Sequence, residues 1–331
     1  MPERAMILVT GGAGYIGSHA VWALADRGEA VVVADDLSAG VRADLPAAAA
    51  FETGDIGDEA FLARLFADYP IGAVPHFAGL IVVPESVTDP LKYYLNNTAA
   101  SWRLIRAAQD AGVGAFIFSS TAAVYGNPEH PPVDEGAAKR PISPYGSSKL
   151  MTEQMLQDAG AAHGLAYGIL RYFKVAGADP KGRTGQSSPM ATHLIKIASE
   201  VAVGARPGMA IFGTDYDTPD GTAVRDYIHV ADLIEAHLLA LDHLRGGGEP
   251  FIANCGYGRG YSVREVVAAM ERACGHRLEV AEAGRREGDP AVLTAAADWV
   301  RGLLGWRPRY DDLDIIVETA LDWERRLRRA G

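Results

Sequence analysis

The sequence has 331 residues, of which 48% are hydrophobic and 22% charged, so we expect a globular protein rather than a disordered or fibrous one. The 31 Lys and Arg residues against 42 Asp and Glu residues give a net charge of −11, which argues against a nucleic-acid partner. Two cysteines cannot form a disulfide framework, and neither a long apolar run nor a secretory pattern is visible, so we expect no membrane partner and a cytoplasmic location.

Short apolar runs alternate with amphipathic stretches over the first half of the chain. The runs predict strands at Met6–Thr10, Ala30–Asp35, Phe51–Gly54, Ala73–Phe77, Phe116–Ser119 and Leu165–Arg171. This alternation is typical of strand–helix–strand units, and continuous apolar runs are typical of strands that are buried on both faces. We therefore predict an α/β fold with a Rossmann-type, doubly wound parallel sheet.

The pattern changes after about Asp179, where a connection rich in Gly, Pro and Ser leads to irregular helices and short strands. We predict a Rossmann domain over residues 1–179 and a smaller mixed α/β lobe over residues 180–331. The helix-like pattern Tyr227–Leu244 is expected to return to the first part, so that a segment near 223–250 belongs with the Rossmann domain.

A glycine-rich turn follows the first predicted strand and precedes a helix predicted over Ser18–Arg27. Gly11, Gly14 and Gly17 have the spacing G-x-x-G-x-x-G. Glycine at these positions permits a tight turn, a close approach of backbone N–H groups to a pyrophosphate, and close packing of helix on strand. The turn therefore predicts dinucleotide binding.

The cofactor type is indicated by Asp35, which ends the second predicted strand. A carboxylate there would accept hydrogen bonds from the adenosine ribose hydroxyls and would repel the additional phosphate of NADP. Asp36 is a second candidate for this role, and Asp55 and Ile56 follow the third strand, where they suit the adenine edge. These residues favour NAD.

Tyr145 and Lys149 lie four residues apart, on one face of a helix predicted to start after Pro144. The strand end from Ser119 to Thr121 is rich in hydroxyls and is expected beside the nicotinamide. Because an ammonium and a cationic nicotinamide both favour phenolate, we expect the pKa of Tyr145 to be lowered from its usual value near 10. The pattern predicts hydride transfer at a carbinol carbon, with Tyr145 as the base.

Eight short motifs are distributed over essentially the whole chain. They are Gly11–His19, His76–Gly79, Pro84–Val87, Tyr93–Asn97, Ser143–Gly146, Arg171–Phe173, Val224–His229 and Arg285–Asp289. In this order and spacing they resemble the UDP-glucose 4-epimerases, which are extended short-chain dehydrogenase/reductases. The resemblance implies an isomerase with tightly bound NAD that interconverts UDP-galactose and UDP-glucose through a 4-keto intermediate, with the nucleotide sugar in the 180–331 lobe.

The resemblance also implies roles for individual residues. Tyr145, Lys149 and Thr121 are the implied catalytic residues. The implied NAD contacts are Gly11, Gly14, Tyr15, Ile16, Gly17, Asp35, Asp36, Asp55, Ile56, Phe77, Ala78, Gly79, Asn96, Ser119, Tyr145, Lys149 and Phe173. The implied substrate contacts are Thr121, Lys174, His193, Phe212, Arg225, Arg286, Asp289 and Leu293. His76 and His229 are expected to be packed structural residues, and nothing clusters with the spacing of metal ligands.

The chain departs from the pattern at several positions. Lys174 stands where the family has Asn, and it would either neutralise phosphate charge or bind a carboxylated sugar. Leu293 replaces a Tyr that narrows the hexose pocket in some bacterial members, which implies additional activity on UDP-N-acetylhexosamines. Ala122 and Ala123 replace the acidic pair of the related dehydratases, so elimination of water is not expected.

Three alternatives remain open at this point. The first is a 4-epimerase of another UDP-sugar, a pentose or a uronic acid. The second is a net NAD-dependent nucleotide-sugar oxidoreductase or decarboxylase. The third, a non-catalytic NAD-sensing protein, is less favoured because such proteins commonly lack the Tyr and Lys that are present here.

The resemblance further implies a homodimer, in which helices near residues 93–112 and 145–163 pair across a two-fold axis. Apolar side chains that suit such a face are Trp102, Leu104, Ile105, Met155 and Leu156. The alternative for these side chains is a place in the core of the subunit.

Overall fold

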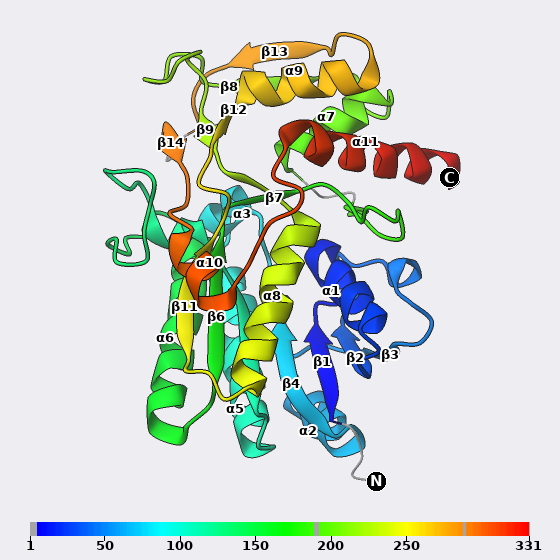
Figure 1. The fold of residues 1–331 in the computed structure, drawn as a ribbon, viewed down its shortest axis with the longest axis vertical. Helices are drawn as coiled ribbons and strands as arrows, with labels where there is room; N and C mark the ends of the chain where they lie inside the picture. Colours follow the sequence, from blue (N-terminus) through cyan, green and yellow to red (C-terminus); the bar gives the residue numbers. More distant parts are fainter. Residues whose placement is uncertain (1–4, 189–191, 287–288, 331) are drawn as a thin grey trace.

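The structure is a computed structural model that describes residues 5–188, 192–286 and 289–330. Figure 1 shows a large sheet covered by helices, with a smaller group of helices and short strands beyond the carboxyl ends of the sheet strands. Within the described ranges, no helix combines the length and the apolar character needed to cross a bilayer.

Seven parallel strands form the central sheet. They are β1 (Met6–Thr10), β2 (Val31–Asp35), β3 (Ala50–Thr53), β4 (Ile71–His76), β5 (Ala115–Thr121), β6 (Tyr167–Tyr172) and β11 (Phe251–Cys255). Their spatial order is β11-β6-β5-β4-β1-β2-β3. The chain builds outward from β1 in one direction and from β4 in the other, so the strand order reverses between these two strands. This confirms the predicted doubly wound parallel sheet.

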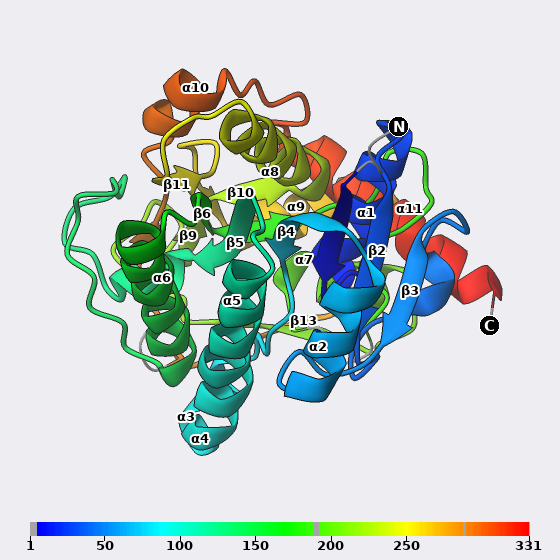
Figure 2. The same cartoon turned by 90° about the horizontal axis from the view of Figure 1, so that it is seen from below.

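Helices cover both faces of the sheet (Figure 2). One face carries α1 (Tyr15–Asp26) and α8 (Val230–Arg245), and the other carries α2 (Glu59–Asp68), α5 (Ala100–Asp110) and α6 (Pro144–His163). Successive residues of β1 feed the two layers, because Ile7 and Val9 belong to the first core and Leu8 to the second. Burial on both faces explains why the strand sequences are nearly continuous apolar runs.

The helix that carries Tyr145 begins at the predicted place. The hydroxyl of Ser143 accepts the N–H of Gly146 at 3.2 Å and caps α6, and Pro144 occupies the first helical position. Gly164, with φ +74, ends the helix in the left-handed conformation. Tyr145 therefore lies in the first turn of α6.

The predicted helical pattern Tyr227–Leu244 divides into a strand and a helix. Tyr227–His229 forms β10, which pairs with β7 (Lys174–Ala176), and α8 follows it. The helix starts there because the Nδ1 atom of His229 accepts the N–H of Ala231 at 3.1 Å and caps it. The predicted helix was therefore wrong for its first three residues, but α8 packs on the sheet as expected.

The smaller part contains the remaining long helices and several short strands. They are α7 (Leu194–Ala202), α9 (Val263–Cys274), α11 (Leu313–Ala330), β8 (Met209–Phe212), β9 (Val224–Arg225), β12 (Tyr261–Ser262), β13 (Val280–Ala283) and β14 (Val292–Leu293). Five short elements lie along the chain between strands of the large sheet: η1 (Arg42–Asp44), α3 (Val83–Thr88), α4 (Pro90–Tyr93), η2 (Tyr94–Ala99) and η3 (Ala122–Tyr125). The short helix α10 (Asp298–Leu304) follows β14. Strand β9 pairs with β12 and β14, and β8 pairs with β13.

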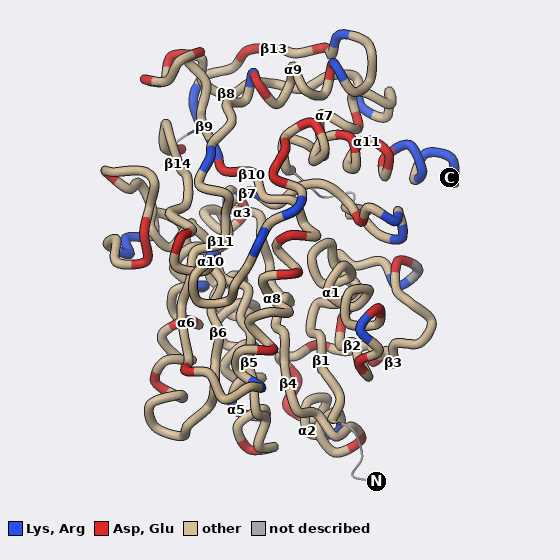
Figure 3. The backbone as a smooth tube through the Cα atoms, in the orientation of Figure 1, with Lys and Arg blue, Asp and Glu red and all other residues tan. Residues whose placement is uncertain are grey.

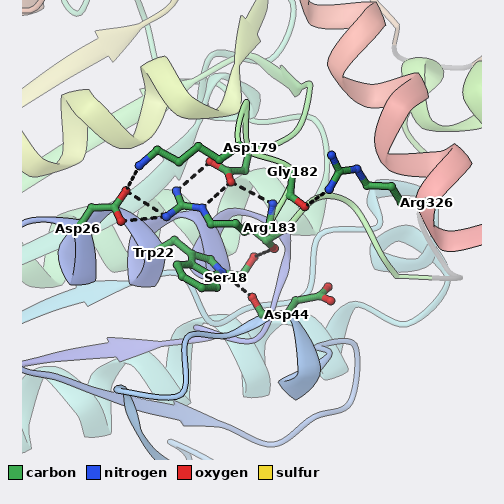
Figure 4. A network of polar contacts seen from close by, with 10 residues as sticks. Ser18, Trp22, Asp26, Asp44, Asp179, Gly182, Arg183 and Arg326 are labelled. Atoms are coloured by element: carbon green, nitrogen blue, oxygen red, sulfur yellow. Dashed lines mark hydrogen bonds and ion pairs between the residues drawn. The ribbon is translucent and has the colours of Figure 1, made fainter. Parts of the chain in front are cut away.

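A polar network ties the connection between the two parts to α1 (Figure 4). The Arg183 guanidinium donates to Asp179 at 2.7 Å and to Asp26 at 2.9 Å. It also lies 4.5 Å from the centre of the Trp22 ring. The helix that follows the glycine turn is thereby attached to the segment that leads to the smaller part.

Candidate active site

The glycine turn between β1 and α1 leaves little room for side chains. Gly11 has φ +66, and a Cβ there would lie 2.5 Å from the backbone nitrogen of Ala78 at the end of β4. A Cβ on Gly17 would overlap the carbonyl oxygen of Gly11. Gly14 is the N-cap residue of α1, so the helix N-terminus faces the point where the strand order reverses. This arrangement fits the pyrophosphate of a dinucleotide.

Asp35 lies beside this turn at the end of β2. Its carboxylate accepts the N–H groups of Ala13 at 2.9 Å and Leu37 at 2.8 Å, and burial raises its pKa. A carboxylate has about four acceptor positions, so two remain for ribose hydroxyls. Asp36 is exposed and accepts from Ser38 at 2.6 Å instead, so Asp35 is the better placed of the two predicted carboxylates.

Four other predicted cofactor contacts have side chains engaged within the protein. Asp55 accepts the N–H of Gly57 at 2.7 Å, and Ile56 belongs to the core on the α2 face. The Tyr15 hydroxyl donates to a carbonyl of the connection between the two parts at 2.7 Å, and Ile16 packs against the opposite core. Any contact of Tyr15 and Ile16 with a pyrophosphate therefore falls to their backbone N–H groups.

The segment after β4 approaches the reactive residues closely. A Cβ on Gly79 would lie 3.4 Å from Nζ of Lys149 and 3.1 Å from Oδ1 of Asn97. The buried Asn97 amide donates to the Leu80 carbonyl at 3.0 Å and accepts the Leu80 N–H at 2.8 Å, whereas Asn96 accepts the same N–H at 3.2 Å. Asn97 was not among the predicted contacts, although it stands in one of the eight motifs.

The three predicted catalytic residues meet at the carboxyl end of β5. Tyr145 is 8% exposed, and its phenol is hydrogen-bonded to the side chain of Thr121. The Lys149 ammonium donates to the carbonyl of Ser119 at 3.1 Å and lies 4.9 Å from the centre of the Phe118 ring. The Tyr145 phenol, the Thr121 hydroxyl and the Lys149 ammonium therefore lie together in a buried site.

The lowering of the Tyr145 pKa was predicted for the NAD-bound site and stays a prediction, because the protein's own groups act in the other direction. Burial raises the pKa of Tyr145, and the hydrogen bond with Thr121 opposes this only in part. Burial also lowers the pKa of Lys149 to about 8, against an opposing effect of the Glu153 carboxylate. For both groups, the cost of removal from water outweighs the stabilising contacts of their charged forms.

A chain of buried polar groups that the sequence did not predict lies behind Tyr145. His237 Nδ1 donates to the Leu233 carbonyl at 2.9 Å, so its Nε2 accepts from the Ser119 hydroxyl at 2.9 Å. Burial lowers the pKa of His237 to about 4 and keeps the ring neutral. Tyr172 is hydrogen-bonded to the Ser119 side chain, and Phe77 packs on the His237 ring at 5.0 Å. Tyr172 could have been predicted as a site residue because it lies in the Arg171–Phe173 motif. His237 lies in none of the eight motifs, so the sequence gives no signal for it.

Cationic side chains gather on the smaller part, near β9 (Figure 3). Arg225 pairs with Asp289 at 3.3 Å, and the Arg286 guanidinium lies 3.9 Å from the centre of the Phe212 ring. The pKa of Lys174 is lowered mainly by partial desolvation and, to a smaller extent, by the positive charge of Arg225. The Lys174 side chain nevertheless reaches solvent. The predicted substrate cations are therefore near neighbours.

The remaining predicted substrate residues border this cluster. Nδ1 of His193 is buried without a hydrogen-bond partner among the described residues, and burial, with a smaller effect of Lys174, lowers its pKa to about 4. Leu293 is paired in register with Arg225 and packs on the same small apolar cluster as Phe173. His193 thus offers a free polar atom beside the cations, and Leu293 an apolar wall.

His76 and His229 are packed structural residues, as predicted. The two ring nitrogens of His76 contact the hydroxyls of Thr10 at 2.7 Å and Ser101 at 2.8 Å, and burial lowers its pKa to about 3. His229 caps α8 and contacts Thr319 at 3.1 Å. Both rings are fully engaged in holding the fold.

Comparison with known proteins agrees with this geometry. The model of the NAD dependent epimerase/dehydratase family matches residues 7–256. A UDP-glucose 4-epimerase of Azospirillum brasilense is 60% identical, with 98% of this chain and 93% of the relative covered. A UDP-glucose 4-epimerase of Brucella ovis solved in complex with NAD superposes with a TM-score of 0.93 at 44% identity, covering 96% of this chain and 98% of that one. The UDP-Glc/GlcNAc 4-epimerase of Campylobacter jejuni gives a TM-score of 0.85 at 47% identity, covering 97% and 99%. The chain therefore belongs to the NAD-dependent epimerase/dehydratase family.

Proposed function

We propose that this enzyme is an isomerase that interconverts UDP-galactose and UDP-glucose through a 4-keto intermediate, with NAD held throughout the cycle. The observation that carries the proposal is the meeting of Tyr145, Lys149 and Thr121 beside the glycine turn, with Arg225 and Arg286 across from them on the smaller part. A base, a dinucleotide site and a phosphate site are what the reaction needs in one cleft.

The chain's own residues supply the acid–base part of the reaction. NAD, when bound, would supply the hydride acceptor for C4 of the sugar and the hydride donor for the opposite face of the 4-keto sugar. Tyr145 takes the proton of the sugar 4-hydroxyl and gives it back, and Thr121 orients the same oxygen. A positive charge on Lys149 near the phenol would favour the phenolate form of Tyr145. Gly11, Gly17 and Asp35 hold the cofactor.

The sugar must turn between the two hydride steps, so binding has to be concentrated on the UDP group. Lys174, Arg225 and Arg286 carry three positive charges, and Asp289 neutralises one of them. The two that remain match the charge of a diphosphate, which favours the phosphate role of Lys174 over the carboxylated-sugar role. His193 adds a buried, unpaired ring nitrogen, and Phe212 a ring for the uridine side.

Leu293 supports a second substrate class. Its side chain lies next to Arg225 and Phe173 and is shorter than that of a tyrosine. We therefore expect UDP-N-acetylglucosamine to be epimerised as well. A rate indistinguishable from background with this substrate, beside a normal rate with UDP-galactose, would rule it out.

We infer that two copies pair through an apolar face of α4, η2, α5 and α6. Leu91, Leu95 and Trp102 are 76%, 65% and 50% exposed, and Met151 is 47% exposed. A hollow between these elements is lined by Tyr94, Thr98, Ala99, Trp102, Met151 and Met155. Large apolar side chains grouped in this way are typical of protein interfaces.

Two free cysteines, one of them buried, are consistent with the cytoplasm as the compartment that we propose.

Part of the predicted dimer face is corrected by the structure. Leu104, Ile105 and Leu156 are at most 5% exposed and belong to the core between the sheet and α5 and α6. Leu104 and Leu156 point inward because they lie on the other side of their helices from Trp102 and Met151, whereas Ile105, about one turn from Trp102, is covered within the same core. The exposed face is carried by Trp102 and Met151, with Met155 only partly buried.

The test is turnover of UDP-galactose by purified protein without added NAD, with products resolved by chromatography. We expect UDP-glucose to form, and Tyr145→Phe to lower the rate by roughly 100-fold or more while NAD stays bound. The matched control is Tyr167→Phe at the opposite end of β6, which should keep the activity. No product from NAD-loaded protein, or net oxidation with accumulation of NADH, would contradict the proposal.

A further inference from the structure

A buried ion pair lies one helical turn beyond Lys149 on α6. Glu153 is fully buried and Arg171 is 2% exposed. The Arg171 guanidinium approaches the carboxylate with two nitrogens, Nε at 2.9 Å and Nη2 at 2.5 Å. Tyr145, Lys149 and Glu153 follow each other at intervals of four residues, so they share one face of the helix.

Glu153 is also hydrogen-bonded to β5, the strand that ends beside Tyr145 and Lys149. One of its oxygens accepts the hydroxyl of Ser120. Ser120 stands between Ser119, whose carbonyl accepts the Lys149 ammonium, and Thr121, whose side chain is hydrogen-bonded to Tyr145. A movement of the Glu153 carboxylate would therefore change the positions of the groups that contact Lys149 and Tyr145.

The far side of Arg171 is equally constrained. Its Nη1 donates to the Tyr125 hydroxyl at 3.0 Å, which in turn donates to Asn254 on β11 at 2.7 Å. Five separate elements, η3, β5, β6, β11 and α6, therefore hold the pair in one geometry. A buried ion pair gains little stability over apolar side chains of the same size, because both charges lose their hydration. Stability is thus a weak reason for this arrangement.

The charge of Glu153 reaches the catalytic lysine. In the described part of the chain, two titratable groups interact with Lys149: Glu153 on its own helix and His76 on β4. Tyr93 on α4 and Tyr172 on β6 interact with Tyr145, and burial raises the pKa of both, so they carry no charge. The neutral His76 contributes no charge, and the carboxylate raises the pKa of Lys149 against the effect of burial. Glu153 is thus the negative group that helps Lys149 to keep its proton.

We propose that Glu153 is a positioning residue: it fixes the end of β5 through Ser120 and keeps a negative charge one turn from Lys149, so that Lys149 remains cationic beside Tyr145. The proposal deepens the proposed function and rests on it. Arg171 holds the carboxylate in place and in its charged form.

The experiment compares Glu153→Gln with the unchanged enzyme in two measurements. The first is titration of Tyr145 in NAD-loaded protein without substrate, followed by ¹³Cζ-tyrosine NMR and assigned with Tyr145→Phe. The second is the pH profile of kcat with UDP-galactose. Loss of a negative charge favours loss of protons, so we expect the apparent pKa values of the Tyr145–Lys149 pair to fall by roughly one pH unit in both measurements.

Two controls separate positioning from stability. Glu324→Gln also removes the carboxylate of a buried pair, because Lys196 on α7 donates to Glu324 on α11 at 2.5 Å, away from α6. It should lower Tm without moving either titration. Glu153→Asp keeps the charge, so the pH profile should stay in place while the shorter reach to Ser120 lowers kcat.

The outcomes distinguish the positioning role of Glu153 from the proposed epimerase function. Unshifted titrations in Glu153→Gln, or an equal shift in Glu324→Gln, would overturn the positioning role even if the enzyme is a normal epimerase. An inactive enzyme would defeat the proposed function, and the Tyr145 titration would still decide the role of Glu153. If Glu153→Gln does not fold, the double variant E153Q/R171Q removes both buried charges. The two charges act on Lys149 in opposite directions, but Glu153 and not Arg171 has a resolved effect on its pKa, so we expect a smaller acid shift in the double variant. No shift, or a shift toward alkaline pH, overturns the proposal.

Discussion

Lys174 decides how much charge the smaller part offers to a diphosphate. Its ammonium has Arg225 and Arg286 as charged neighbours, and Asp289 balances only one of the three cations. Replacement by Asn leaves one positive charge where a diphosphate carries two negative ones. The residue therefore acts on binding of the nucleotide and not on the chemical step.

For Lys174→Asn we predict a UDP affinity that is lower by about 10-fold, the cost of one charge-assisted hydrogen bond, with kcat nearly unchanged. Calorimetric titration with UDP at two salt concentrations measures this, and the salt dependence should be shallower in the variant. Lys181→Asn is the control, because Lys181 is exposed and pairs with Asp26 away from the cleft. An equal loss of affinity in both variants would show that Lys174 contributes only general surface charge.

For single residues, the sequence predicted those proposed catalytic groups that lie close together along the chain. Tyr145 and Lys149 share a helix face because of their spacing, whereas Thr121, at the end of the preceding strand, was assigned through the family resemblance. His237 and Glu153 were missed, because their roles depend on contacts with Ser119 and Ser120 across the fold. No spacing rule predicts such contacts before the sheet is assembled.

At the scale of single elements, the glycine turn depends on the absence of a Cβ at Gly17. We predict that Gly17→Ala loses NAD on purification and is destabilised by about 1–3 kcal/mol, because the added methyl group overlaps the Gly11 carbonyl oxygen. The absorbance of NAD released on denaturation and the Tm measure the two effects.

Gly302→Ala in α10 is the matched control. A Cβ at Gly302 would meet no described heavy atom within 4 Å, so alanine should be neutral or stabilising by up to about 1 kcal/mol. If Gly17→Ala kept its full NAD content, the close packing of α1 on β1 would not be needed for the cofactor.

The elements themselves were largely predictable because apolar runs buried on both faces have an unmistakable pattern. Strand β1 agrees with the prediction at both ends, and the other five predicted strands agree within a few residues. Two features escaped. The Tyr227–His229 strand was hidden because its residues also fit a helical pattern, and β11 was missed because its pairing with β6 joins distant parts of the chain.

At the scale of the whole molecule, the exposed apolar face on α5 and α6 predicts the oligomeric state. We expect the unchanged protein to be a dimer and Trp102→Arg to be a monomer, because the new charge would have to be buried at the interface. Size-exclusion chromatography with light scattering at matched concentrations measures this.

Trp299→Arg is the control for the dimer. Trp299 is 52% exposed, close to the 50% of Trp102, but it lies on α10. The control should remain dimeric. A dimer that persists in Trp102→Arg, or a monomeric unchanged protein, would contradict this assignment of the face.

The central claim is that the hydrogen removed from C4 of the sugar is returned to the same sugar molecule. The most direct measurement uses UDP-galactose with deuterium at C4 and determines the isotope in the UDP-glucose product by mass spectrometry. We predict that the label is retained at C4, with none in the solvent and no net change in the bound cofactor. Loss of the label, or its appearance in NADH released from the enzyme, would contradict the account.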